Sequence, residues 1–100
     1  MSAVAEFQLD TSTAEVLAVA GVLSFDTAGS ALGEIQVALS SGTIRQLDLA
    51  GVSRADSAGL ACIVAVVAEA DRCGRTLQVT HMPVGMQALA QVCEVDRLFA

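Results

Sequence analysis

The sequence predicts an α/β domain with a four-stranded mixed β-sheet and three to four helices mainly on one face of that sheet. Two observations lead to this prediction. Apolar segments of strand length alternate with longer segments whose apolar residues recur at helical spacing. Glycine, proline or small polar residues separate most of these segments. The segments follow the order β-β-α-β-α-β-α, and we expect its two β-α-β passages to be right-handed crossovers between parallel strands.

Length and composition predict a single domain, residues 1–100, with an aliphatic core. A chain of 100 residues buries roughly two thirds of its unfolded surface. Hydrophobic residues make up 54% of the chain but aromatic residues only 3%, so Ala, Val and Leu must fill the core. The net charge of −6 opposes binding to nucleic acid and to anionic lipid surfaces. The longest apolar run, residues 59–68, is about half of a membrane span, and no secretory signal is expected.

The first part of the chain predicts two strands and a helix. Residues 4–9 alternate between apolar and polar and indicate an edge strand, whereas residues 15–23 are almost continuously apolar. Ser24 or Asp26 can cap a helix that runs to about residue 40. Five apolar residues of that segment fall on one helix face: Ala28, Ala31, Leu32, Ile35 and Leu39.

The central stretch, residues 47–69, predicts the end of a strand, a polar loop and a helix. We expect the strand to span residues 44–49 and the loop to contain Gly51, Ser53 and Arg54. The helix has apolar residues at the i, i+3, i+4, i+7 spacing of a buried face: Leu60, Ile63, Val64 and Val67. It ends at Cys73 and Gly74, because glycine suits the C-terminal cap.

The start of this helix is the most informative site in the sequence. Either Asp56 or Ser57 can be the N-cap, because each has a short side-chain oxygen that can accept from free backbone N–H groups. If Asp56 is the cap, Ser57 is free to contact a partner. Free N–H groups and the helix dipole also favour negative charge here. Arg54 is either solvated or available to pair with an acidic group of a partner.

The central helix is apolar beyond the face that a core requires. Ala58, Ala61, Cys62 and Ala65 lie where a surface helix is normally polar. Small side chains let another backbone approach closely, so we interpret these four residues as part of a docking surface. The alternative is that neighbouring helices cover them.

The remaining residues give no indication of catalysis. We expect a strand over residues 76–80 and a helix from Pro83. His81 is the only histidine, and a solvent-facing or capping role is expected because no second ligand or nucleophile accompanies it. The three cysteines lack CxxC spacing and indicate reduced thiols. We therefore expect no enzyme activity, metal or cofactor.

The segment LDLAGVSRADSAGLACIV resembles the signature of STAS domains, which anti-sigma-factor antagonists share with the cytoplasmic tails of sulfate transporters. That signature is a strand ending in D-L-S-x-V and, a few residues later, D-S-x-G-L at the start of a helix. Residues 48–52, DLAGV, correspond to the first part with Ala50 at the position of the serine, and residues 56–60, DSAGL, match the second part. Residues 21–32 and 95–99 are similar to the family's second strand with first helix and to its usual end. The resemblance implies the STAS fold over the whole chain.

Residues 52–61, VSRADSAGLA, are most similar to the V-S-R-x-D-[ST]-x-G-L-A motif of a small stand-alone STAS subunit, the MlaB type. That subunit belongs to the Mla-type phospholipid-trafficking ABC transporter of Gram-negative bacteria, which maintains outer-membrane lipid asymmetry. The resemblance implies a non-enzymatic cytoplasmic subunit that binds the ATPase and supports it. The partner-binding residues would then be Arg54, Asp56, Ser57, Ala58, Ala61, Cys62 and Ala65.

The alternative is an anti-sigma-factor antagonist, in which a serine kinase phosphorylates the serine that matches Ser57. The added charge would make or break a protein contact. Such proteins usually carry G-E-L-D where this chain has residues 21–24, GVLS. Ala58 and Ala61 also replace the serine and the second glycine of their D-S-S-G-L-G motif. We therefore favour the transporter subunit and keep phosphorylation of Ser57 as the alternative.

Overall fold

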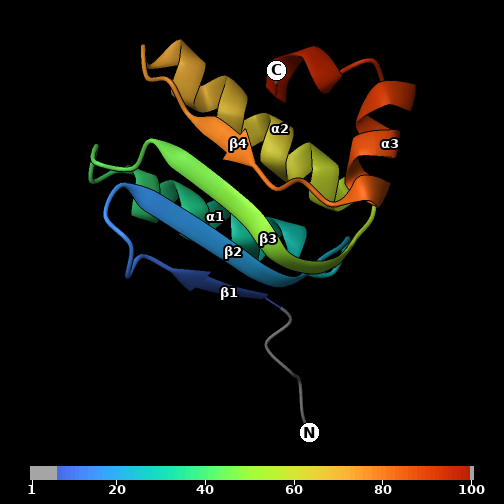
Figure 1. Cartoon of the computed structure of the whole chain (residues 1–100), viewed down its shortest axis with the longest axis horizontal. Coiled ribbons are helices and arrows are strands. Elements are labelled where there is room, and N and C mark those ends of the chain that lie inside the picture. Colours follow the sequence, from blue (N-terminus) through green and yellow to red (C-terminus); the bar gives the residue numbers. More distant parts are fainter. Residues whose placement is uncertain (1–6, 100) are drawn as a thin grey trace, which may run out of the picture.

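The computed structural model describes residues 7–99, which form a β-sheet with helices packed on one face (Figure 1). The strands are β1 (Phe7–Asp10), β2 (Val16–Leu23), β3 (Gln46–Ala55) and β4 (Gln78–Thr80). The helices are α1 (Ala28–Leu39), α2 (Ser57–Arg72), α3 (Val84–Val92) and a short 3-10 helix, η1 (Asp96–Phe99). The sheet has the order β1-β2-β3-β4, with β1 antiparallel to β2 and the other pairs parallel. The predicted mixed sheet and element order are confirmed.

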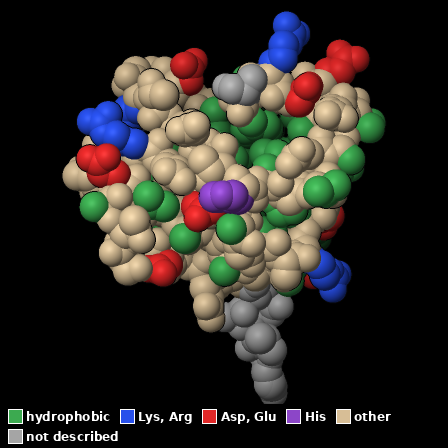
Figure 2. Space-filling view, in the orientation of Figure 1, with side chains coloured by type: hydrophobic (Ala, Val, Ile, Leu, Met, Phe, Trp, Pro, Cys, Tyr) green, Lys and Arg blue, Asp and Glu red, His purple; other side chains and the backbone are tan. Residues whose placement is uncertain are grey.

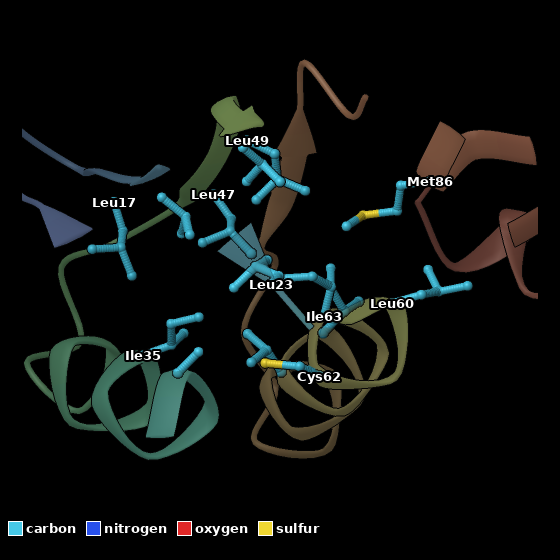
Figure 3. Packing of buried hydrophobic residues seen from close by; sticks show 14 of the residues in the cluster. Leu17, Leu23, Ile35, Leu47, Leu49, Leu60, Cys62, Ile63 and Met86 are labelled. Carbon is cyan, nitrogen blue, oxygen red and sulfur yellow. The ribbon is translucent and has the colours of Figure 1, made fainter. Parts of the chain in front are cut away.

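The core lies between the sheet and helices α1 and α2, and α3 closes it beyond β4 (Figure 3). Its side chains are aliphatic apart from sulfur-containing residues, as the composition predicted. The largest fully buried side chains are Leu17, Leu23, Ile35, Leu47, Leu49, Ile63, Met86, Val19 and Val66. Figure 3 shows Met86 extending from α3 into the space between the sheet and α2. Helix α2 is therefore central, because it contacts the sheet, α1, α3 and η1.

Strand β3 is longer than predicted, and the expected loop of Gly51, Ser53 and Arg54 is wrong, because all three residues belong to the strand. The pairing of β3 with β2 contains two register shifts, each of which leaves one extra residue on β3. The buried residues of β3 are Leu47, Leu49 and Val52. The first two are two residues apart, but the first shift adds a residue, so Val52 follows three residues after Leu49. Buried and exposed residues therefore do not alternate at this end of the strand, and for that reason its sequence is typical of a loop.

Helix α1 begins later than predicted, and neither Ser24 nor Asp26 caps it through its side chain. The cap position is Thr27, whose side chain is buried and closes the preceding turn. Its hydroxyl accepts from the Ser24 N–H at 2.8 Å and donates to the Val22 carbonyl at 2.9 Å. The predicted start of the last helix, at Pro83, is confirmed. The predicted end of the central helix, at Gly74, is confirmed as well. Residues 4–6 of the first predicted strand lie outside the described residues.

The first turn of α2 packs directly on the end of β2, and Gly59 makes this packing possible. A Cβ atom at this position would overlap the carbonyl oxygen of Leu23 and lie 2.9 Å from the Leu23 Cβ. Backbone atoms cannot move aside as a flexible side chain can. Glycine is therefore required where the helix start meets the strand end.

We predict that Gly59→Ala lowers the free energy of unfolding by about 1–3 kcal/mol, the usual penalty for overpacking. The matched control is Gly85→Ala in α3, where a new Cβ would meet nothing within 4 Å. Alanine favours helix over glycine, so this control should keep or raise stability by up to about 1 kcal/mol. Urea unfolding measures both variants. Equal stability of Gly59→Ala and the wild type would show that the helix start is not packed on Leu23.

Candidate functional site

The candidate site is the start of α2, together with the end of β3 and the loop between β2 and α1. Asp56 is the N-cap, which resolves the alternative left open by the sequence. Its Oδ1 accepts from the N–H groups of Ala58 at 2.9 Å and Gly59 at 3.0 Å. Its Oδ2 accepts from the Phe25 N–H at 3.0 Å. One carboxylate therefore holds both the helix start and the neighbouring loop.

The charge of Asp56 is stabilised by these bonds. The N–H groups of Gly59 and then Phe25 hold the pKa of the Asp56 carboxyl below its usual value. The expectation of free N–H groups for an external anion therefore needs correction, since the Asp56 carboxylate already occupies those of Ala58 and Gly59. The helix dipole favours a negative charge here, and the chain supplies that charge itself.

Ser57 is the first residue of α2 and is exposed. Its hydroxyl has no hydrogen-bond partner among the described residues, so it is available at the surface. Arg54, at the end of β3, is also exposed and forms no ion pair within residues 7–99. The structure thus brings Arg54, Asp56 and Ser57 together, with Asp56 engaged in backbone hydrogen bonds and the other two side chains open to solvent.

The predicted docking face of α2 is narrower than expected. Ala61 and Ala65 are exposed, and Ala58 is half-buried. Ala68 continues the same exposed row, which we call the alanine stripe (Ala61, Ala65, Ala68). The stripe follows Ser57 at helical spacing, so the hydroxyl and the small side chains share one side of the helix.

Cys62 does not belong to this face, and its assignment as a partner-binding residue is corrected. Its side chain is only 4% exposed, and Figure 3 shows it directed from α2 toward the α1 side of the core. Burial raises the pKa of the Cys62 thiol, since the charged form is desolvated. Val66, one turn further on, is buried in the same way. The alternative of coverage by a neighbouring helix therefore holds for Cys62 and not for the alanine stripe.

Phe25 is a member of the site that sequence reasoning missed. Its side chain is 83% exposed, although its backbone N–H is bound to Asp56. The chain has only three aromatic residues. The signal in the sequence that indicates this residue is an aromatic side chain directly after a buried strand, between Ser24 and Asp26.

A second polar cluster lies on the open face of the sheet, away from α1 and α2. The Nδ1 of His81 is 3.0 Å from Oδ1 of Asp48, and Figure 2 shows the histidine beside an acidic side chain on this face. The Ala50 N–H and, to a smaller extent, His81 lower the pKa of the Asp48 carboxyl. His81 is exposed as expected, but its contact with Asp48 was not predicted. The cluster joins the end of β4 to β3.

A groove of about 420 Å³ lies between the C-terminal halves of α1 and α2. Its lining includes Leu39, Val66 and Cys73, so it is at the opposite end of α2 from Ser57. Within residues 7–99, no group of three metal-ligating side chains could hold a metal ion. No helix in this part of the chain has both the length and the apolar character needed to cross a membrane.

Comparison with known proteins agrees with this architecture. The family model described as "Mlab, STAS domain" matches residues 7–100. The anti-sigma factor antagonist SpoIIAA in its unphosphorylated form has a TM-score of 0.69 at 17% identity, covering 92% of this chain and 84% of that one. The phosphorylated form of SpoIIAA, a Bacillus cell fate determinant, gives 0.67 at 18% identity, with 92% and 86% coverage. At these identities the likeness concerns the fold. No curated protein matches the chain.

The pKa of Asp56 leads to a testable pH dependence. A carboxyl whose folded pKa is lowered stabilises the fold above its unfolded pKa of about 3.9, and this contribution is lost as the pH falls through the folded pKa. Asp56→Asn keeps an oxygen that can cap the helix but cannot titrate. We predict that the wild type loses more unfolding free energy than Asp56→Asn between about pH 5 and pH 2. Parallel curves in urea titrations would contradict the assigned role of the carboxylate.

Proposed function

The chain belongs to the MlaB-type STAS domain family, and from this membership we propose that it is a non-enzymatic subunit of an Mla-type phospholipid-transport ABC complex. In this role it binds the ATPase at the cytoplasmic face of the inner membrane and supports its assembly or activity. The observation that carries the proposal is the match of the MlaB-type family model to residues 7–100. The exposed hydroxyl of Ser57, on a helix start that Asp56 holds in place, supports a partner contact there.

Asp56 and Ser57 make different contacts, and this difference supports a partner-binding role for Ser57. Asp56 accepts three backbone hydrogen bonds and maintains the local structure. Ser57 makes no side-chain hydrogen bond within the described residues, so the fold does not depend on its hydroxyl. A surface hydroxyl on a preorganised backbone can donate to or accept from a partner with little loss of conformational entropy.

The alanine stripe extends this surface along α2. Its side chains end at Cβ, so an opposing helix or loop can approach the α2 backbone closely. Arg54 supplies the complementary charge at one end, where it can pair with a carboxylate of the ATPase. The proposed interface therefore consists of Arg54, Ser57 and the alanine stripe, with Ala58 at its border.

The second candidate is an anti-sigma-factor antagonist that is switched by phosphorylation at Ser57. Its support is the fold shared with SpoIIAA and the accessibility of Ser57. The sequence favours the first candidate, because residues 21–24 are GVLS in place of the antagonists' G-E-L-D, and Ala58 and Ala61 replace two residues of their D-S-S-G-L-G motif. The matching family model is also of the MlaB type.

Copurification with the Mla-type ATPase and permease tests the proposal. The wild type should elute with the ATPase in a defined complex, and a serine kinase recovered in its place would support the second candidate. We predict that Ser57→Ala weakens this contact while leaving the melting temperature nearly unchanged, since the hydroxyl has no internal partner. Full binding and full cellular activity of Ser57→Ala would contradict a role for this hydroxyl.

The alanine stripe gives an independent prediction. Ala65→Glu should abolish association, because an unpaired carboxylate buried in an interface costs several kcal/mol. The isolated variant should differ from the wild type by only about 0.5 kcal/mol in stability, as surface substitutions usually do. Ala88→Glu, at an exposed alanine of α3, is the matched control and should bind normally. Calorimetry and copurification measure the two effects. A stable Ala65→Glu protein that still binds would place the interface elsewhere.

A further inference from the structure

Phe25 combines high exposure with a fixed backbone. Its side chain is 83% exposed, yet three hydrogen bonds hold the backbone around it. The Phe25 N–H donates to Asp56 at 3.0 Å, the Ser24 N–H donates to the Thr27 hydroxyl at 2.8 Å, and the Thr27 N–H donates to the Ser24 carbonyl at 3.0 Å. The loop is thus ordered before any partner arrives. An aromatic side chain on such a loop loses little further entropy on binding.

The position of Phe25 relates it to the candidate site. Its hydrogen bond to Asp56 places it against the residue that precedes Ser57. Phe25 and Ser57 follow the carboxyl ends of the adjacent parallel strands β2 and β3, the edge at which α/β sheets usually bind ligands. Val84, at the start of α3, is a second exposed apolar side chain that follows the carboxyl end of a parallel strand, β4, and it is 81% exposed. Apolar groups therefore follow both strands that flank β3.

Charge limits the kind of partner. The chain carries −6 overall, and Asp26 is exposed directly beside Phe25. Two copies that met symmetrically through this loop would bring their Asp26 carboxylates together, and an anionic lipid surface would be repelled in the same way. A protein pocket with Lys or Arg at its rim would accept both the ring and the neighbouring carboxylate.

We propose that Phe25 is the apolar anchor of the partner interface and inserts into an apolar pocket with a basic rim on the partner protein. This inference rests on the proposed function, because the pocket is expected next to the surface of the partner that contacts Ser57. Buried aromatic side chains near the centre of an interface carry a large share of its binding energy. Phe25 would thus supply affinity, and Ser57 and Arg54 would supply polar specificity.

Photo-crosslinking in the native cell tests this anchor. The photoreactive residue p-benzoylphenylalanine replaces Phe25 in one strain, Ser57 in a second and Val37 in a third. Val37 is the matched control, because it is an apolar side chain that is 73% exposed and lies in the last turn of α1, whereas Phe25 precedes the first turn of that helix. We expect the same protein to be crosslinked from positions 25 and 57 and not from position 37. That protein is then purified, and its affinity for variants of the full chain is measured.

Phe25→Ser should weaken this affinity about 30-fold, the effect of an aromatic hot spot, whereas Val37→Ser should leave it unchanged. Phe25→Leu should retain most of the affinity, and Asp26→Lys should weaken binding if the rim is basic. Melting temperatures verify that the Phe25 and Val37 variants stay folded, as their exposure predicts.

The outcomes separate the anchor from the proposed function. A crosslinked protein other than the ATPase, with Phe25-dependent affinity, would overturn the ATPase proposal and support the anchor. The ATPase crosslinked from position 57 only, or bound equally by wild type and Phe25→Ser, would support the function and overturn the anchor. Crosslinks from position 25 only to a second copy of the chain or to lipid would also overturn the anchor. Unchanged binding by Asp26→Lys would overturn the basic rim.

Discussion

The carboxylate of Asp56 is the interaction on which the rest of the site depends. It accepts backbone N–H groups from the start of α2 and from the loop after β2, so it joins two segments that are far apart in the chain. The Asp56 N–H in turn donates to the Leu23 carbonyl at 3.2 Å. Gly59 then lets α2 pack on the same strand end. Because these contacts use backbone atoms, they fix the loops while the side chains of Phe25 and Ser57 remain exposed.

The two register shifts in β3 determine where this junction lies. Each shift adds one residue to β3 and so changes which residue of β3 lies opposite the end of β2. As a result, Ala55 pairs with Leu23, and Asp56 lies next to the β2–α1 loop. Gly51 fits the first shift, since a Cβ there would lie 2.8 Å from the Ala20 Cβ. Irregular pairing is common beside functional sites, where it reorients side chains. Here it leaves Ser53 and Arg54 exposed at the end of the strand.

Helix α2 shows how packing selects the exposed surface from a sequence that is apolar on nearly every side. The sheet, α1, α3 and η1 all contact it, and together they bury Cys62, Val66 and the face predicted from Leu60 and Ile63. Only one row of small residues remains open, starting from Ser57. The surface that α2 leaves exposed is consequently narrow, and the exposed aromatic ring of Phe25 lies at its N-terminal end.

The sequence alone determined the element order, the aliphatic core and the strand–helix junction at which the candidate site lies, because apolar periodicity and glycine or proline signals act over a few neighbouring residues. It also limited the cap to Asp56 or Ser57. Tertiary structure decided between them, since the Phe25 N–H that Asp56 also binds comes from a distant loop. It likewise decided the length of β3, the burial of Cys62 and the exposure of Phe25. These depend on strand register and on which helix covers which face, and neither is encoded by local spacing.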